Sequence, residues 1–144
     1  ELQKYFKKYQ ARVFSKNSKI FIKLCRLISP IKIFQPIIIE LDDLNTTIVL
    51  DILSKSIKTV NLNPDLAMSS ESLKFILQFP FGFDTLTVNG CFEEINKNGF
   101  SKATKALAIE NLNNIGLSFR PSILLSFKTI FLFLQRLKEV NKKI

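Results

Sequence analysis

The sequence contains no histidine, no tryptophan and only two cysteines among its 144 residues. Without histidine, the chain cannot form an imidazole metal site, a Ser-His-Asp triad or a Cys-His dyad. Two cysteines exclude both a disulfide framework and a four-cysteine zinc site. The sequence therefore predicts a binding or accessory domain that is not an enzyme on its own, with no cofactor and no metal.

Glycine and proline are also scarce, at four and five residues. Phosphate-binding loops of the Walker and dinucleotide types need several glycines at fixed spacing, which segments 81–83 and 89–91 do not provide. Hydrophobic residues make up 47% of the chain, which argues against disorder and low-complexity repeats. A chain of this length and composition predicts one domain with a sizeable core.

Long apolar runs free of charge are absent as well. The longest candidate runs from Leu117 to Leu134 and is interrupted by Arg120, Pro121 and Lys128, so no transmembrane helix is expected. The first residues have no apolar signal-peptide region. The chain also lacks an initiator methionine, so we expect a processed chain or a piece of a longer protein. The expected location is the cytoplasm, with a membrane-peripheral location as the alternative.

Basic residues outnumber acidic ones by 21 to 12, and the excess is uneven along the chain. Residues 1–34 carry a net charge of +8, residues 35–94 of −6 and residues 95–144 of +7. Basic ends suit phosphate on nucleic acid or on lipid headgroups, whereas solvated lysines on helix surfaces need no partner. The acidic middle and the absence of zinc-finger and RNP-type motifs argue against nucleic acid as the partner.

Apolar residues at helical spacing predict helices near both ends of the chain. The patterns cover residues 2–14, residues 19–28 and, after Pro121, an apolar helix over residues 122–140. In the middle, Ser69 or Ser70 is expected to cap a helix that Pro80 ends. A further helix, with Ser101 as its cap, is expected at 100–112.

Runs rich in β-branched residues predict short strands between these helices. The dipeptide Asn89-Gly90 is expected to form a type I′ hairpin that pairs the last strand with residues 91–93. The expected strands are residues 37–41, 46–53, 57–62, 66–68 and 85–88.

These patterns together predict an α+β fold. Its antiparallel or mixed sheet is covered by helices on one face, with extra N- and C-terminal helices. Residues 1–34 are expected to form a basic helical lead-in, and residues 35–144 a single α+β domain with its core at residues 37–112.

The chain offers few groups that could carry chemistry. The adjacent carboxylates Asp42-Asp43 and Glu93-Glu94 could assist acid–base chemistry or bind Mg²⁺. However, Asp42-Asp43 lies between two expected strands, where a turn is favoured, and Glu93-Glu94 ends a strand with no third ligand nearby in sequence. Cys91 has no histidine to activate it, and the neighbouring glutamates would raise its pKa, so packing is favoured. No catalytic or metal-binding residue is assigned.

Phenylalanine is concentrated between residues 75 and 83. A densely packed core explains this cluster most simply, and an apolar cavity for an acyl chain or sterol-like ligand is the alternative. Only one periodic face of the segment can point inward, so part of any such set is expected to be plain core. The candidate pocket residues are Phe75, Leu77, Phe79, Phe83, Leu86 and Val88.

A resemblance adds to these observations. The sequence NPDLAMSSESLKFIL at residues 63–77, followed by PFGFDTLTVNGCF at residues 80–92, resembles a pattern of sterol carrier protein-like domains. The form Gly-Phe-Asp-Thr-Leu-x-Val-Asn-Gly-x-Phe is similar to the C-terminal domain of some bacterial metallo-β-lactamase-fold hydrolases. The matched core covers residues 37–112. The resemblance implies a five-stranded sheet with helices on one face that encloses or edges an apolar tunnel.

The resemblance also implies a function. Members of this family hold or transfer lipids, or serve as accessory domains beside a catalytic zinc domain, which a chain without histidine cannot contain. It therefore implies a non-catalytic domain that binds an apolar small molecule or lipid, with a catalytic domain as partner in the same polypeptide.

Two alternatives stay open. One is a peripheral membrane module whose basic helices at residues 2–28 and 122–143 lie on an anionic bilayer. The other is a structural domain that forms a homodimer through the apolar surface from Leu117 to Leu134.

Overall fold

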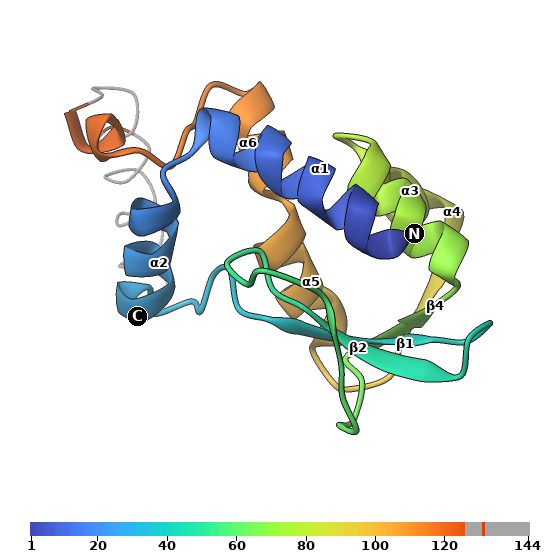
Figure 1. Ribbon diagram of the computed structural model, residues 1–144. Helices are drawn as coiled ribbons and strands as arrows, with labels where there is room; N and C mark the ends of the chain where they lie inside the picture. The colour runs from blue at the N-terminus through green and yellow to red at the C-terminus, as the bar shows by residue number, and fades with distance from the viewer. Residues whose placement is uncertain (126–130, 132–144) are drawn as a thin grey trace.

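The computed structural model describes residues 1–125 and residue 131. Over these residues, helices flank a group of short strands (Figure 1). The elements are α1 Leu2–Lys16, α2 Lys19–Ile28, β1 Ile37–Leu41, β2 Thr46–Leu50, β3 Lys58–Thr59, β4 Leu66–Met68, α3 Ser70–Gln78, α4 Gly82–Asn89, β5 Phe92–Glu94, α5 Gly99–Leu107, α6 Ile109–Asn114 and the 3₁₀ helix η1 Pro121–Leu125.

The strands form one five-stranded sheet in the order β3-β2-β1-β4-β5. β1 and β4 pair in parallel, and the other three neighbouring pairs are antiparallel. Along β1, Ile37, Ile39 and Leu41 are buried, whereas Ile38 and Glu40 are partly exposed, as the two-residue period of a strand requires. Helices cover the sheet on one face, where α1, α3 and α6 lie together (Figure 1). The predicted α+β fold with a mixed, mostly antiparallel sheet is confirmed.

Helix α1 is part of the same core as the sheet. Its apolar stripe of Phe6, Tyr9 and Val13 is almost fully buried, and the helix packs against α3 and α6. Burial of this stripe explains why a helix with lysines on much of its remaining surface is stable here.

The segment that was expected to form a strand at residues 85–88 is helical instead, within α4. Gly82 allows α4 to lie against α3, because a Cβ at this position would be 2.6 Å from the Cα of Ile76. Gly90, with φ of 64°, ends α4 in the left-handed conformation rather than forming a hairpin turn. Phe92–Glu94 then pairs with β4 and not with residues 85–88.

Four further elements differ from the prediction. β2 ends at Leu50, because a carboxylate oxygen of Asp51 accepts a hydrogen bond from the Leu53 amide and starts a turn. The strand expected at residues 57–62 is reduced to β3. The helix expected at residues 100–112 is divided at Ala108 into α5 and α6. Of the apolar helix expected at residues 122–140, the start is the 3₁₀ helix η1, and most of the rest lies outside the described residues.

Helix α5 begins at Gly99, with Asn98 at the N-cap position, and not at a Ser101 cap. Gly99 is required here because a Cβ at this position would clash with the backbone oxygen of Asp65. The start of α5 is therefore fixed by its close approach to the residue that precedes β4.

Asp65 connects β1, β4, α5 and the segment after β5. Its carboxylate accepts hydrogen bonds from the Ile38 amide at 2.9 Å and from the Lys102 ammonium at 2.7 Å. Its backbone oxygen accepts from the amides of Ile95 and Asn96, and its own amide donates to the Ile38 oxygen. The residue is only 7% exposed. Removal of the carboxylate would therefore leave the partly buried Ile38 amide and the Lys102 ammonium without this acceptor.

We predict that Asp65→Ala lowers the free energy of unfolding by about 2–4 kcal/mol, because it unpairs the Ile38 amide and the Lys102 ammonium. Urea unfolding followed by circular dichroism measures the change. Asp42→Ala, which removes an exposed carboxylate from the β1–β2 turn, is the matched control and should change stability by less than about 0.5 kcal/mol. Equal effects of the two substitutions would contradict the role of Asp65.

Candidate functional site

The six residues predicted to line a pocket do not share one surface. Three are buried in the core, one is partly buried, and two are exposed to solvent. Four cavities are formed by residues that the structure describes, and the linings of these four include none of the six. Ligand binding by this set stays a prediction. In the order of the three groups, the residues are Leu77, Phe83 and Leu86, then Phe75, then Phe79 and Val88.

The phenylalanine rings of this region pack against other rings. Phe83, Phe92 and Phe100 form a stacked group with ring centroids 5.7 to 6.1 Å apart. Phe75 and Phe79 form a tilted pair with centroids 4.7 Å apart. Such aromatic packing stabilises a core without leaving space for a ligand.

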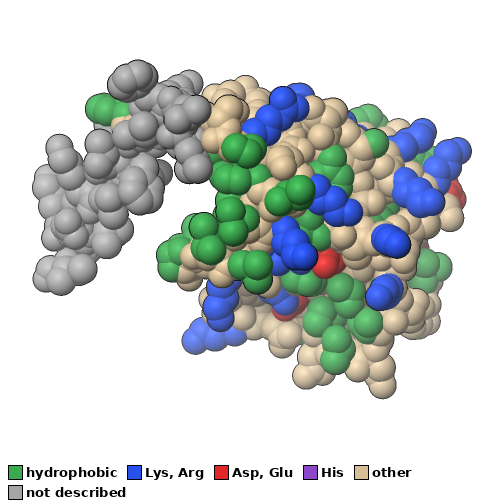
Figure 2. Space-filling view, turned by 60° about the vertical axis from the view of Figure 1, so that its left-hand side comes forward, with side chains coloured by type: hydrophobic (Ala, Val, Ile, Leu, Met, Phe, Trp, Pro, Cys, Tyr) green, Lys and Arg blue, Asp and Glu red, His purple; other side chains and the backbone are tan. Residues whose placement is uncertain are grey.

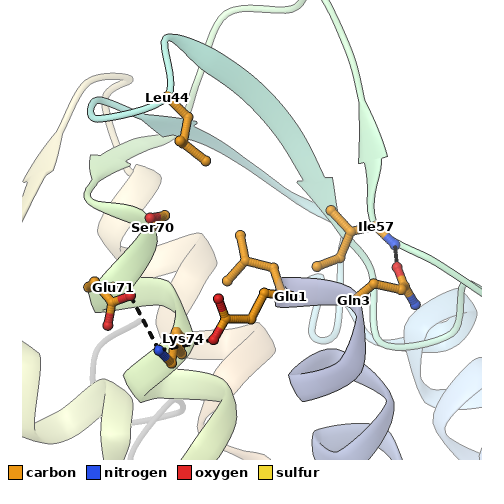
Figure 3. Close-up of a pocket in the computed structure, with 8 residues that line it drawn as sticks. Glu1, Gln3, Leu44, Ile57, Ser70, Glu71 and Lys74 are labelled. Atoms are coloured by element: carbon orange, nitrogen blue, oxygen red, sulfur yellow. Dashed lines mark hydrogen bonds and ion pairs between the residues drawn. The ribbon is translucent and has the colours of Figure 1, made fainter.

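A cavity of about 420 Å³ lies where the first residues of α1 meet α3 and the β1–β2 turn. Figure 3 shows that Lys74 in this cavity is engaged by the carboxylates of Glu1, at 3.2 Å, and Glu71, at 3.3 Å. The amide oxygen of Gln3 accepts a hydrogen bond from the Ile57 amide. The ammonium is therefore neutralised by the protein's own carboxylates. The lining residues are Glu1, Leu2, Gln3, Leu44, Ile57, Ser70, Glu71 and Lys74.

Beside this cavity, Asp43 joins the β1–β2 turn to the start of α3. Its carboxylate accepts hydrogen bonds from the hydroxyl and the backbone amide of Ser70, and these bonds lower the pKa of Asp43 from its ordinary value of 3.8. The turn predicted at Asp42-Asp43 is confirmed, and so is the N-cap, since Ser69 accepts from the Ser72 amide. Sequence reasoning missed the bridge between Asp43 and Ser70, because it joins residues 27 positions apart.

Helix α2 presents an apolar surface to solvent. Ile22 is its one fully buried residue, so most of the helix contributes little to the core. At helical spacing, residues 20, 24, 27 and 28 lie on one side of the helix, and residue 31 follows the helix end. We call these five residues the α2 face: Ile20, Leu24, Leu27, Ile28 and Ile31, exposed by 82%, 47%, 74%, 69% and 61%.

Basic side chains border the α2 face. Lys19, Lys23 and Arg26 follow one another at helical spacing along the neighbouring side of α2. Arg26 is neutralised by a bidentate ion pair with Asp51. In the residues that the structure describes, neither Lys19 nor Lys23 forms an ion pair. Figure 2, in which the α2 side comes forward, shows hydrophobic side chains interspersed with Lys and Arg there.

A groove of about 510 Å³ runs along this border between apolar and basic residues. Its apolar lining includes Leu53, which follows β2, is partly buried and packs against the core. The groove thus combines hydrocarbon with cationic groups. Its lining residues are Lys19, Ile20, Lys23, Arg26, Leu27 and Leu53.

The structure also places the other predicted surfaces. The apolar stripe of α1 is buried, so of the predicted membrane helices within residues 2–28 only α2 offers an apolar face. The predicted membrane helix at residues 122–143 and most of the predicted interface from Leu117 to Leu134 lie outside the described residues. Within that interface, Phe119 packs edge-to-face against Phe34, with ring centroids 4.9 Å apart.

The described residues contain no cluster of three or more His, Cys, Asp and Glu side chains that could hold a metal. Cys25 and Cys91 are free thiols, and burial raises the pKa of Cys25, which disfavours its nucleophilic form. Cys91 is exposed, so the packing role expected for it is wrong. Among the described helices, none has the length and hydrophobicity needed to cross a membrane.

Comparison of the chain with protein-family models, curated proteins and solved structures gives no match. The resemblance to sterol carrier protein-like domains therefore stays a prediction. Of the surfaces described above, the groove beside α2 is the one that offers both apolar wall and lysines without an acidic partner in the described residues.

We predict that the carboxyl of Asp43 titrates below 3.8 in the folded protein, because Ser70 stabilises its charged form. A lowered folded pKa means that this contribution to stability is present above the unfolded pKa and is lost as the pH falls through the folded pKa. Ser70→Ala removes the largest cause and should raise the midpoint towards 3.8. An NMR titration of the Asp43 carboxyl measures both, and an unchanged midpoint in Ser70→Ala would contradict this account.

Proposed function

We propose that this domain is a non-catalytic lipid-binding domain and that it binds an anionic amphiphile in the groove beside α2. The observation that carries the proposal is the lining of that groove, which combines apolar side chains with cationic ones. The apolar residues are Ile20, Leu27 and Leu53, and the lysines are Lys19 and Lys23. A hydrocarbon chain with a carboxylate or phosphate at one end has the matching distribution of apolar surface and charge.

The size and energetics of the groove support this ligand class. A volume of about 510 Å³ lies within the range of small-molecule sites. Each methylene group that leaves water contributes about 0.8 kcal/mol, so an acyl chain along the apolar wall supplies most of the affinity. The two lysines then orient the headgroup, because an ammonium near the protein surface attracts an anion across the groove.

The proposed ligand class is the one that the resemblance implies, but the proposed binding site lies elsewhere in the fold. The groove is formed by α2 and Leu53, which follows β2, and not by the segment from Phe75 to Val88. An accessory role beside a catalytic domain of the same polypeptide is compatible with it, since the groove needs no catalytic group.

We predict that Leu27→Ser weakens the binding of a dansyl-labelled fatty acid by about tenfold or more, because it removes apolar wall from the groove. Fluorescence titration of the full chain measures the affinity. Leu62→Ser is the matched control, since Leu62 is also exposed, by 55%, and does not line the groove beside α2. Its affinity should equal that of the unmodified protein.

A third variant separates the groove from the pocket predicted by sequence. Val88→Ser alters an exposed member of the predicted pocket set and should leave fatty-acid binding unchanged. If Val88→Ser weakens binding and Leu27→Ser does not, the ligand lies at the α4 side and the groove beside α2 is not the site.

A further inference from the structure

The apolar surface on α2 extends beyond the groove. Leu24, Ile28 and Ile31 are exposed by 47%, 69% and 61%, yet none of them lines the groove. A single acyl chain in the groove would leave these three side chains in water. A contiguous exposed apolar surface of this kind indicates contact with an extended partner.

The charge around the α2 face restricts what that partner is. Lys19 and Lys23 lie along the helix, and the exposed Lys32 follows it. The carboxylate of Asp51 is already paired with Arg26. Residues 1–34 carry a net charge of +8. The partner must therefore offer negative charge next to apolar material.

The α2 face could also be covered by the chain's own residues 126–144 or by a second copy of the chain, but both are basic. The sequence from residue 126 to residue 144 has five basic residues and one acidic residue. A second copy that met the α2 face with its own would bring together two surfaces that are both bordered by Lys19 and Lys23. Either contact brings like charges together, which is unfavourable at short range.

We infer that the α2 face docks on the surface of an anionic lipid bilayer, and that the groove ligand is taken from this bilayer. The inference rests on the proposed function. Lys19 and Lys23 contact the headgroup phosphates, and the residues of the α2 face enter the boundary between headgroups and acyl chains, as in interfacial amphipathic helices. The helix lies along the membrane surface, and the sheet and α1 remain in water.

Vesicle co-sedimentation of the full chain tests the inference. Vesicles of phosphatidylcholine and phosphatidylglycerol in equal parts should bind the protein at low salt, whereas vesicles of phosphatidylcholine alone should bind it at least about tenfold more weakly. High salt should weaken the charge-dependent part of the binding. Equal binding to both vesicle types would overturn the inference.

A charge-matched pair of variants separates local contact from total charge. K19Q/K23Q should weaken binding to the mixed vesicles by about tenfold or more, because both lysines lie at the headgroups. K4Q/K7Q removes the same charge from exposed positions on α1 and should weaken it by no more than about twofold, since screening limits distant charges. Equal losses in the two variants would show attraction by net charge alone and would overturn docking through α2.

Ile28→Ser distinguishes bilayer docking from ligand binding in the groove. Ile28 lies outside the groove, so the variant should weaken vesicle binding and leave the affinity for the dansyl-labelled fatty acid unchanged. Circular dichroism verifies that the variant is folded, as expected for a side chain that is 69% exposed.

The remaining outcomes also decide the question. Fatty-acid binding without vesicle binding would overturn the inference and leave the proposed function standing, and loss of both would overturn both. If sedimentation of the unmodified protein shows a dimer that Ile28→Ser converts to a monomer, a second copy covers the α2 face, and the bilayer assignment is wrong.

Discussion

The buried carboxylate of Asp65 holds the sheet to the helices that follow it. Through this one residue, the amide of Ile38 in β1, the ammonium of Lys102 in α5 and two amides after β5 share a single set of acceptors. Because β1 lies between β2 and β4, fixing its start also sets the position of the hairpin. The arrangement of the sheet against which α1 packs therefore depends on the polar contacts of Asp65, which join segments that are distant in sequence.

Further polar contacts fix α1 and thereby leave α2 outside the core. Arg12 pairs with the buried Glu110 of α6 and donates to carbonyl oxygens at the end of α3, and the bonded Glu110 raises the pKa of Arg12. Asn17 exchanges hydrogen bonds with Asn113, and the Ser18 amide donates to the Phe119 oxygen. These contacts hold the end of α1 and the start of α2, so α2 extends from an anchored turn with only Ile22 fully buried.

Local signals predicted most of the fold. The strands at residues 37–41 and 66–68 and the helix at residues 19–28 match the structure in both boundaries, since β-branched runs and helical spacing act over a few residues. The strand prediction for residues 85–88 was wrong. Their β-branched side chains favour a strand locally, whereas packing of Gly82 against α3 favours a helix. Asn-Gly is equally a hairpin turn and a helix end, and the sequence around Gly90 does not distinguish the two.

The candidate site could be predicted only in part, for a related physical reason. Helices α1 and α2 both combine basic with apolar residues, and both lie within the residues 2–28 that the membrane alternative places on a bilayer. The two helices differ in whether their apolar face is buried in the core. That difference depends on long-range contacts, such as the ion pair between Arg12 and Glu110, which are 98 residues apart. Because the apolar stripe of α1 is buried in the core, the lysines of α1 border a buried surface, whereas Lys19 and Lys23 border the exposed α2 face. Only the second arrangement can bind charge and hydrocarbon at the same place.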